Sequence, residues 1–182
     1  MRRKLVFFAI LLWFSAMPLS AFAEGSIGVV DVRHILTNAD AAKHVEVQRQ
    51  KLREKFLTET TKIEQDLRAE EKALLEQRSK LSQEEYFSKR SAYEAKILEI
   101  RKQTQKKRRQ LEDASNAAMD VLRDQLYVVV QSIANEREFE LVISNQNVIA
   151  GEKSLDITEE TMKRLNEQLK QIPLKLGGDA DG

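Results

Sequence analysis

Residues 45–74 read VEVQRQKLREKFLTETTKIEQDLRAEEKAL, a charged stretch that carries regularly spaced apolar side chains. They recur at steps of 7, 4, 7, 4 and 7 residues, at Val45, Leu52, Phe56, Ile63, Leu67 and Leu74. This spacing predicts a long α-helix with one narrow apolar seam, too thin to be buried in a globular core. We therefore expect a helix that packs against a single partner helix and leaves the rest of its surface in water.

The partner helix is expected to follow directly in the chain. No Gly or Pro occurs over residues 41–79, and Ser82 then precedes Glu85 by three residues, the spacing of a capping box. Beyond this turn a second helix runs toward Arg137, with apolar residues at helical spacing: Tyr86, Tyr93, Ile97, Ile100 and Leu111. The prediction is an antiparallel coiled-coil hairpin over residues 43–113, here called the arm.

Residues 24–42 and 114–172 are predicted to form a small body, so that the fold class is α+β and mostly helical. Residues 27–32 and 139–144 read as β-strands, and residues 148–150 as the hairpin mate of the second strand. Three short strands leave open edges, so we expect a homo-oligomer that joins them into a shared β-barrel. The residues expected at this interface are Ile27, Val29, Val30, Leu141, Val142, Ile143, Val148 and Ile149.

The ends of the chain and of its helices carry further signals. Asn38 or Asp40 is the expected N-cap of the long helix, and Thr158 starts the last helix. Residues 173–182 are expected to be a flexible tail. Residues 1–23 combine a basic start, a short apolar run and Ala-Phe-Ala, which predicts a secretory signal cut after Ala23.

The composition offers little to a catalytic or metal site. The chain has no Cys and two His, His34 and His44, which lie ten residues apart without a matching ligand pair. The six Gly residues form no phosphate-binding loop, and no nucleophile motif is present. We therefore expect a protein that is not an enzyme, with no metal and no cofactor.

Charge divides the chain into two parts. Residues 43–113 hold 19 Lys and Arg against 14 Asp and Glu, whereas the rest of residues 24–182 holds 8 against 15. Within the arm, six cations fall in nine positions without an acid among them: Arg101, Lys102, Lys106, Lys107, Arg108 and Arg109. This basic collar is either a solvated helix face or a binding surface for an anion.

Three kinds of anionic partner fit such a collar: nucleic acid, acidic lipid or lipopolysaccharide, and acidic unfolded polypeptide. Export from the cytoplasm and the lack of interleaved aromatic residues argue against specific nucleic-acid binding. At the predicted tip of the arm, adjacent Tyr86 and Phe87 cannot both face one seam, because neighbouring residues on a helix point in different directions. At least one aromatic side chain is therefore expected to be exposed there as a binding contact.

The order of these pieces resembles the Skp/OmpH family of periplasmic chaperones. The resemblance rests on Ile27-Gly28-Val29-Val30-Asp31, the charged helical hairpin, residues 139–143 and 148–150, and Asp156-Ile157-Thr158. It implies a homotrimer with a β-barrel body and three helical arms around a cavity. It also implies ATP-independent holding of unfolded outer-membrane β-barrel proteins during their transit across the periplasm.

Two other functions stay open on the sequence alone. A coiled arm can serve as a structural tether between components of the envelope. Alternatively, a basic arm can bind anionic lipid or lipopolysaccharide, with an affinity that falls as salt rises.

Overall fold

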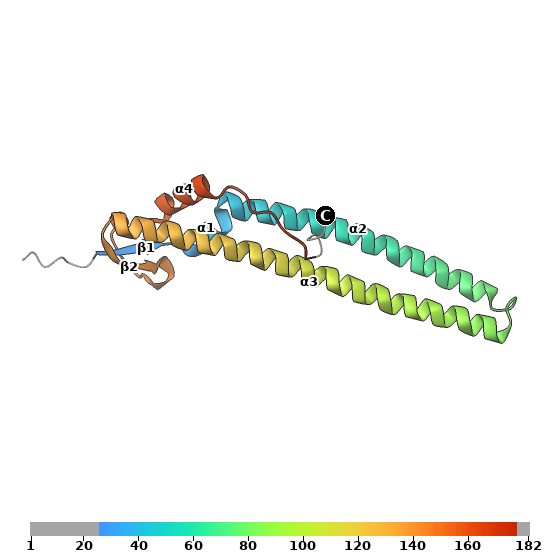
Figure 1. The fold of residues 1–182 in the computed structure, drawn as a ribbon. Coiled ribbons are helices and arrows are strands. Elements are labelled where there is room, and N and C mark those ends of the chain that lie inside the picture. Colours follow the sequence, from blue (N-terminus) through green and yellow to red (C-terminus); the bar gives the residue numbers. More distant parts are fainter. Residues whose placement is uncertain (1–25, 178–182) are drawn as a thin grey trace, which may run out of the picture.

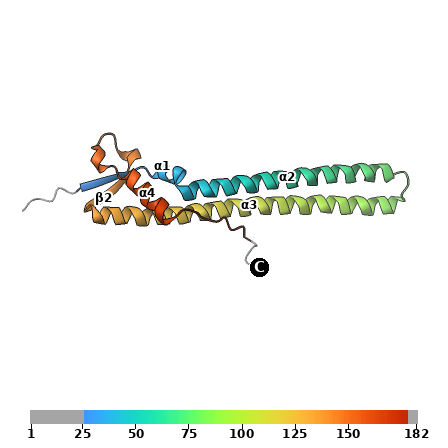
Figure 2. The same ribbon diagram turned by 90° about the horizontal axis from the view of Figure 1, so that it is seen from above.

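The computed structural model describes residues 26–177, which form a small body and a long arm (Figure 1). Two antiparallel helices make the arm, α2 (Asp40–Gln77) and α3 (Gln83–Glu136), and they lie side by side in both ribbon views (Figure 2). At 1.5 Å per residue, α2 is about 57 Å long and α3 about 81 Å. The longer helix therefore runs the length of the arm and continues into the body.

The seam holds the two arm helices together, as predicted. Val45 and Leu74 are buried, and the seam residues between them are half-buried: Leu52, Phe56, Ile63 and Leu67. Across the seam, the Tyr93 hydroxyl donates a hydrogen bond to the Leu67 carbonyl oxygen at 3.2 Å. Because each helix has only one partner, the seam residues of the single hairpin stay partly open to water.

The turn at the tip is the predicted capping box. The Ser82 backbone N–H donates to the Glu85 carboxylate at 2.9 Å, and the Glu85 N–H donates to the Ser82 hydroxyl at 3.3 Å. The hydrogen bond from the Ser82 backbone is the main reason why the pKa of Glu85 lies below its ordinary value. These reciprocal bonds satisfy two otherwise unpaired donors and define the start of α3.

The body is built on two short strands, β1 (Ser26–Val30) and β2 (Phe139–Ser144), which pair in parallel. Parallel strands require a crossover connection, and here that connection contains the whole arm. At Gly28 an added Cβ atom would stand 3.0 Å from the Phe139 ring, so the close approach of the strands favours glycine. Body and arm are thus joined by topology as well as by packing.

The predicted β-hairpin over residues 139–150 is wrong. The chain turns after β2 in a single 3₁₀ turn, η1 (Asn145–Asn147), but within residues 26–177 no strand follows it, and Ile149 is fully exposed. The Asn145 side-chain amide donates to the Asp31 carboxylate at 2.7 Å. This hydrogen bond directs the chain toward the end of β1 instead of back along β2.

The segment after the turn returns to the opposite side of β1. It passes through a second 3₁₀ turn, η2 (Lys153–Leu155), and the Ile157 N–H then donates to the Val29 carbonyl oxygen at 2.9 Å. Val29 also pairs with Asp156 in an isolated parallel bridge. In the described residues β1 therefore has neighbours on both sides, whereas β2 keeps one open edge.

A short helix that the sequence analysis missed, α1 (Val32–Asn38), follows β1. The Asp31 carboxylate caps it by accepting a hydrogen bond from the His34 N–H at 2.8 Å, and this bond lowers the pKa of Asp31. The N-cap expected at Asn38 or Asp40 is not formed, because no side chain caps the start of α2. The predicted first strand was therefore too long at its end, whereas α2 starts within a residue of the predicted position but without the predicted cap.

The core of the body lies where α1, the end of α3 and the last helix, α4 (Thr158–Gln168), meet. Its completely or almost completely buried large apolar residues are Ile35, Leu122, Val129, Ile133, Ile157 and Leu165. Arg164 of α4 donates hydrogen bonds of 2.6 and 2.7 Å to the Glu136 carboxylate at the end of α3. The start of α4 at Thr158 confirms the sequence prediction.

The chain after α4 follows the base of the arm (Figure 1). Ile172 is buried in the core, and Leu174 packs against it. The Gln48 side chain donates to the Ile172 carbonyl oxygen at 2.8 Å and accepts from the Leu174 N–H at 3.1 Å. Residues 173–177, expected to belong to a flexible tail, thus have a defined path along α2, and residues 178–182 lie outside the described residues.

The predicted signal over residues 1–23 also lies outside the described residues. Within residues 26–177, no helix combines the length and the apolar character that crossing a bilayer would require.

Candidate functional site

The basic collar lies on the surface of α3. All six of its side chains are exposed. Lys107 forms an ion pair with Glu59 of α2 at 2.8 Å, and the Arg108 guanidinium lies 5.8 Å from the centre of the Phe56 ring. Across residues 26–177, no carboxylate lies within ion-pair distance of the other four: Arg101, Lys102, Lys106 and Arg109. These four charges are available to a partner.

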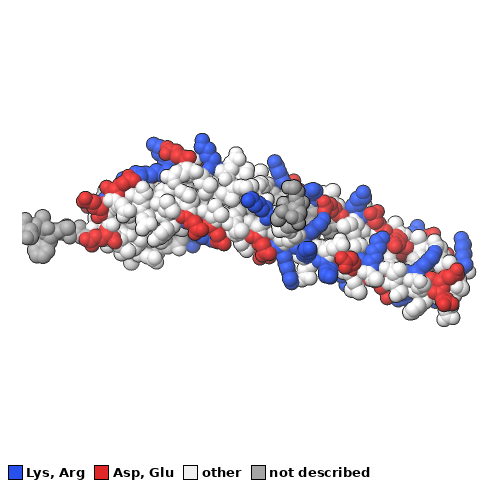
Figure 3. All heavy atoms as spheres, viewed as in Figure 1, with Lys and Arg blue, Asp and Glu red and all other residues white. Residues whose placement is uncertain are grey.

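Figure 3 shows how charge is distributed over one side of the molecule. Lys and Arg side chains recur along the arm, whereas a broad part of the body surface in this view is uncharged. The Lys107–Glu59 pair leaves the net positive charge of the arm unchanged, and its hydrogen bond from Lys107 is the main reason why the pKa of Glu59 lies below its ordinary value. With all of its carboxylates ionised, the arm still carries a net positive charge.

Exposed apolar side chains accompany the cations on the arm. Phe87 at the tip is 73% exposed, while its neighbour Tyr86 is half-buried and stacks on Arg78 at 5.9 Å. Three leucines of the arm are also more than half exposed: Leu57, Leu75 and Leu98. The sequence analysis identified the tip pair but missed these three.

The four exposed residues share one face of the arm. Each directly follows a seam residue, in the pairs Phe56–Leu57, Leu74–Leu75, Tyr86–Phe87 and Ile97–Leu98. One residue along an α-helix is a rotation of about 100°. In two antiparallel helices, the same one-residue step away from a shared seam leads to the same side of the pair. A residue directly after a seam residue cannot face the seam itself, and this argument, which indicates that Phe87 is exposed, applies equally to the three leucines.

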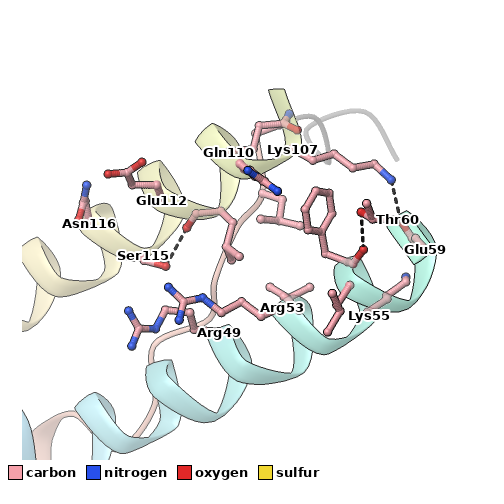
Figure 4. Close-up of a pocket in the computed structure, with 17 residues that line it drawn as sticks. Arg49, Arg53, Lys55, Glu59, Thr60, Lys107, Gln110, Glu112, Ser115 and Asn116 are labelled. Carbon is pink, nitrogen blue, oxygen red and sulfur yellow. Dashed lines mark hydrogen bonds and ion pairs between the residues drawn. The ribbon is translucent and has the colours of Figure 1, made fainter. Parts of the chain in front are cut away.

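A cleft of about 1070 Å³ opens between α2 and α3 near the body (Figure 4). Its floor is apolar and includes the seam residues Leu52, Phe56 and Leu111. Five basic residues and two acidic residues line it: Arg49, Arg53, Lys55, Lys107, Arg108, Glu59 and Glu112. Figure 4 shows Arg49 and Arg53 projecting from α2 and Lys107 reaching Glu59 from α3.

A smaller cleft of about 490 Å³ follows farther along the arm. Ile63, Leu67, Ile97 and Ile100 line it, with Arg101 and Arg108 of the collar among its lining residues. The structure thus brings part of the collar to the openings of the seam. The α2 cations Arg49 and Arg53, which the sequence analysis did not select, complete the basic lining on the other helix.

The candidate interface residues of the body fall into two groups. Val30 is buried, and Val29, Val142, Ile143 and Val148 are half-buried, so these side chains take part in packing within the body. Ile27 and Leu141 are exposed by 40% and 53%, and they are partners in the strand register. This pair forms an apolar surface that a second copy could cover, and Ile149 is exposed as well.

Comparison with known proteins adds to this geometry. The family model described as "Outer membrane protein (OmpH-like)" matches residues 26–165. The chain belongs to the OmpH-like family. The recognition made from the sequence is thereby confirmed, and the family match covers both strands, the whole arm and most of α4.

Individual OmpH-like relatives agree with the family match. The chain is 26% identical over 148 residues to the Skp-like protein of Pseudomonas aeruginosa PAO1. This alignment covers 81% of this chain and 88% of that protein. A crystal structure from Caulobacter crescentus CB15, described as a candidate outer membrane chaperone (OmpH-like), superposes with a TM-score of 0.77. That match covers 85% of this chain and 91% of the other at 16% identity, so it shows the fold.

Proposed function

We propose that this OmpH-like protein is an ATP-independent periplasmic holdase chaperone, which binds unfolded outer-membrane proteins along its arm and keeps them from aggregating. The observation that supports this most directly is the arm surface, where unpaired cations lie beside exposed apolar side chains and open clefts. An unfolded chain offers both apolar segments and carboxylates. The unfolded protein that the arm binds is called the client below.

Binding of this kind relies on many weak contacts. A surface ion pair contributes at most about 1 kcal/mol, and covering one exposed leucine contributes on the order of 1 kcal/mol. Such contacts exchange quickly one by one, but several engaged together hold a client firmly. Release then requires no nucleotide, because folding of the client elsewhere removes the segments that the arm binds.

Several copies working together would enclose a client better than one arm. The open edge of β2 and the exposed apolar residues Ile27, Leu141 and Ile149 support the proposal that the body assembles as a homotrimer with a shared β-barrel. A two-stranded sheet is marginal by itself, so strand pairing between copies would stabilise it. The arms of a trimer would then surround a common space.

The proposed location is the periplasm, reached through the signal predicted over residues 1–23. Transit of clients from the inner-membrane translocon toward the outer membrane fits an exported protein that works without ATP. We propose no catalytic step and no cofactor for this function.

The test is a light-scattering assay with the mature chain, residues 24–182. A urea-unfolded outer-membrane β-barrel protein is diluted into buffer with and without the chain over a salt series. We expect suppressed aggregation near stoichiometric ratio that weakens as salt rises. Unchanged aggregation at every salt concentration would overturn the proposal.

A charge-reversal pair locates the effect on the arm. Changing the four unpaired collar cations Arg101, Lys102, Lys106 and Arg109 to Glu should abolish most of the suppression. The matched control reverses four exposed cations of the body, namely Arg33, Arg123, Lys153 and Lys163, and should leave it nearly unchanged. Equal effects of the two variants would mean that net charge, not the collar, is responsible.

Two other functions are distinguished by their partners. A structural tether would bind one folded envelope component and ignore unfolded chains. A binder of anionic lipid or lipopolysaccharide would associate with anionic vesicles in a salt-dependent manner through the same collar. The exposed apolar side chains of the arm favour the chaperone over both, because neither alternative needs apolar contacts spread along the hairpin.

A further inference from the structure

The segment after α4 runs along α2 at the base of the arm, from Gln48 into the large cleft. The surface that it covers is called the groove below. Residues 172–177 alternate between covered and exposed positions. Ile172 is buried and Leu174 and Leu176 are half-buried, while Pro173, Lys175 and Gly177 are exposed. This period of two is the pattern of an extended chain with one apolar edge.

Gln48 recognises the backbone of this segment. Its amide donates to the carbonyl oxygen of Ile172 and accepts from the N–H of Leu174, at 2.8 and 3.1 Å. A residue of a neighbouring parallel β-strand would contact the same two backbone groups. Because neither bond involves a side chain of the segment, any extended polypeptide could satisfy Gln48 equally well.

The segment also leads directly into the large cleft of the arm. Leu176 and Gly177 are among the residues that line the cleft, and the Gln110 side chain donates to the Gly177 carbonyl oxygen. The rest of the cleft continues along the seam past Phe56. An extended chain bound in the groove can therefore follow the arm beyond the place where residues 172–177 reach.

The charges in the groove do not match its present occupant. The charged residues that line the cleft give a formal excess of three positive charges, one of which, on Arg49, is paired with Glu46 outside the lining. Residues 169–177, with the sequence LKQIPLKLG, add two lysines and no acid. An occupant with the same alternating apolar residues but with carboxylates between them would gain attraction where Lys175 now adds repulsion.

We propose that this groove is a binding site for an extended polypeptide segment in which apolar and acidic side chains alternate, and that residues 174–177 are its displaceable internal occupant. The inference rests on the proposed function, of which it defines one client site. Ile172 stays in the core as an anchor, and the residues after it leave when a client segment takes their place. The apparent affinity for a client is then the intrinsic affinity multiplied by the fraction of time for which the groove is free of its internal occupant.

Three labelled nonapeptides test this assignment on the mature chain by fluorescence anisotropy at low salt. The first alternates Leu with Asp, the second alternates Leu with Lys, and the third contains the residues of the first with its leucines grouped together. We expect the first to bind at least about tenfold more tightly than the others. Equal binding of the three peptides would overturn the proposal.

Two variants of the full chain connect peptide binding to the groove. Leu174→Ser combined with Leu176→Ser weakens the internal occupant and should tighten binding of the Leu-Asp peptide several-fold. Phe56→Ala removes part of the cleft floor and should weaken it. No change in the first variant would contradict displacement, and no change in the second would contradict binding in this cleft.

Hydrogen exchange gives the direct readout of displacement. The Leu174 amide, bonded to Gln48, should lose protection when the Leu-Asp peptide binds, while α4 keeps its protection. A Leu174 amide that stays protected with peptide bound would place the peptide elsewhere and overturn the assignment. Phosphatidylglycerol vesicles that release Leu174 when the peptide does not would assign the groove to lipid instead.

The experiments distinguish failure of the groove proposal from failure of the chaperone proposal. If the Leu-Asp peptide binds as expected but aggregation of an unfolded outer-membrane protein is not suppressed, the groove stands as a peptide site and the chaperone function falls. If aggregation is suppressed but no peptide binds, the chaperone function stands and the groove assignment falls.

Discussion

The two ends of α3 are surrounded very differently, although they belong to one helix. In the body, α3 buries Leu122, Val129 and Ile133 almost completely against α1 and α4. In the arm, Ile97 and Ile100 of the same helix are only half-buried, and Leu98 is 65% exposed. One part of the helix is stabilised by a closed core, and the other part keeps apolar surface free for binding.

This difference separates the part of the chain that contains the closed core from the part that we propose to bind clients. A core that is closed on all sides tolerates little change but leaves nothing to bind a partner. A seam between two helices is weaker, yet it exposes both apolar and charged groups. Substitutions in the body should therefore change the free energy of unfolding most, and substitutions in the arm should change binding most.

The largest effect on stability is expected from Leu122→Ala. Its side chain is completely buried, so the truncation removes apolar contacts and leaves a cavity that costs about 2–5 kcal/mol. Urea unfolding followed by circular dichroism measures this loss. A loss below that of an arm substitution would break the comparison between the two regions.

A matched truncation in the arm, Ile63→Ala, should cost less. Because Ile63 is only half-buried between α2 and α3, we expect a loss of about 1 kcal/mol. Hydrogen exchange should quicken around residue 63 with little change in the body. An equal loss for Ile63→Ala and Leu122→Ala would show that the seam is closed in solution by further copies or by repacking.

Acid should weaken the body through the Glu136–Arg164 pair. The hydrogen bonds from Arg164 are the main reason why the pKa of Glu136 falls from 4.5 to about 2. The Glu136 carboxylate therefore binds a proton less readily in the folded chain than in the unfolded chain. The stabilisation that the pair with Arg164 gives to the folded state is complete above about pH 4.5. It is lost as the pH falls from there toward about 2.

The measurement is the urea midpoint of the wild type and of Arg164→Gln at about pH 6 and pH 3. The variant should lose stability at pH 6 and should then lose less than the wild type on acidification. A difference between the two proteins that is the same at both pH values would contradict a role for this pair in the acid response.

The smallest effect on stability is expected from Phe87→Ala at the tip. Its ring is mostly exposed, so the free energy of unfolding should change by less than about 0.5 kcal/mol. Suppression of client aggregation should nevertheless fall, which Ser88→Ala, the neighbouring exposed control, should not cause. Unchanged suppression in Phe87→Ala would restrict client contacts to the rest of the arm.

Local signals predicted the arm well. The spacing from Val45 to Leu74 located the seam, and Ser82 with Glu85 located the turn to within a residue. Both signals depend on residues that lie close together in the sequence. They can therefore be recognised without knowing which distant segments meet in the fold. The order of strand, arm and strand was also predicted from the residues, whereas the parallel pairing of β1 with β2 was not.

The parts that were wrong or missed depend on distant partners. Residues 148–150 have strand-forming side chains, but the Asn145–Asp31 hydrogen bond and the return of Ile157 to β1 leave them without a strand partner in the described residues. The cleft needs Arg49 and Arg53 from one helix and Lys107 from the other. No pattern within one segment shows such a meeting.

The path of residues 172–177 was missed for the same reason, because it depends on a partner far away in the sequence. Pro, Lys and Gly in this segment are typical of a tail, and its binding partner, Gln48, lies 124 residues before Ile172. The period of two in Ile172, Leu174 and Leu176 was a readable signal of an extended chain with one covered edge. It shows that the segment can lie on a surface but does not identify that surface.

The most direct test of the central claim is hydrogen exchange of the mature chain, free and saturated with an unfolded outer-membrane protein. The account predicts that residues 43–113 of the free chain exchange faster than residues 115–133, and that client binding protects mainly the arm. Protection confined to the body, or no change anywhere while the client is bound, would contradict the claim that the open seam of the arm is the binding surface.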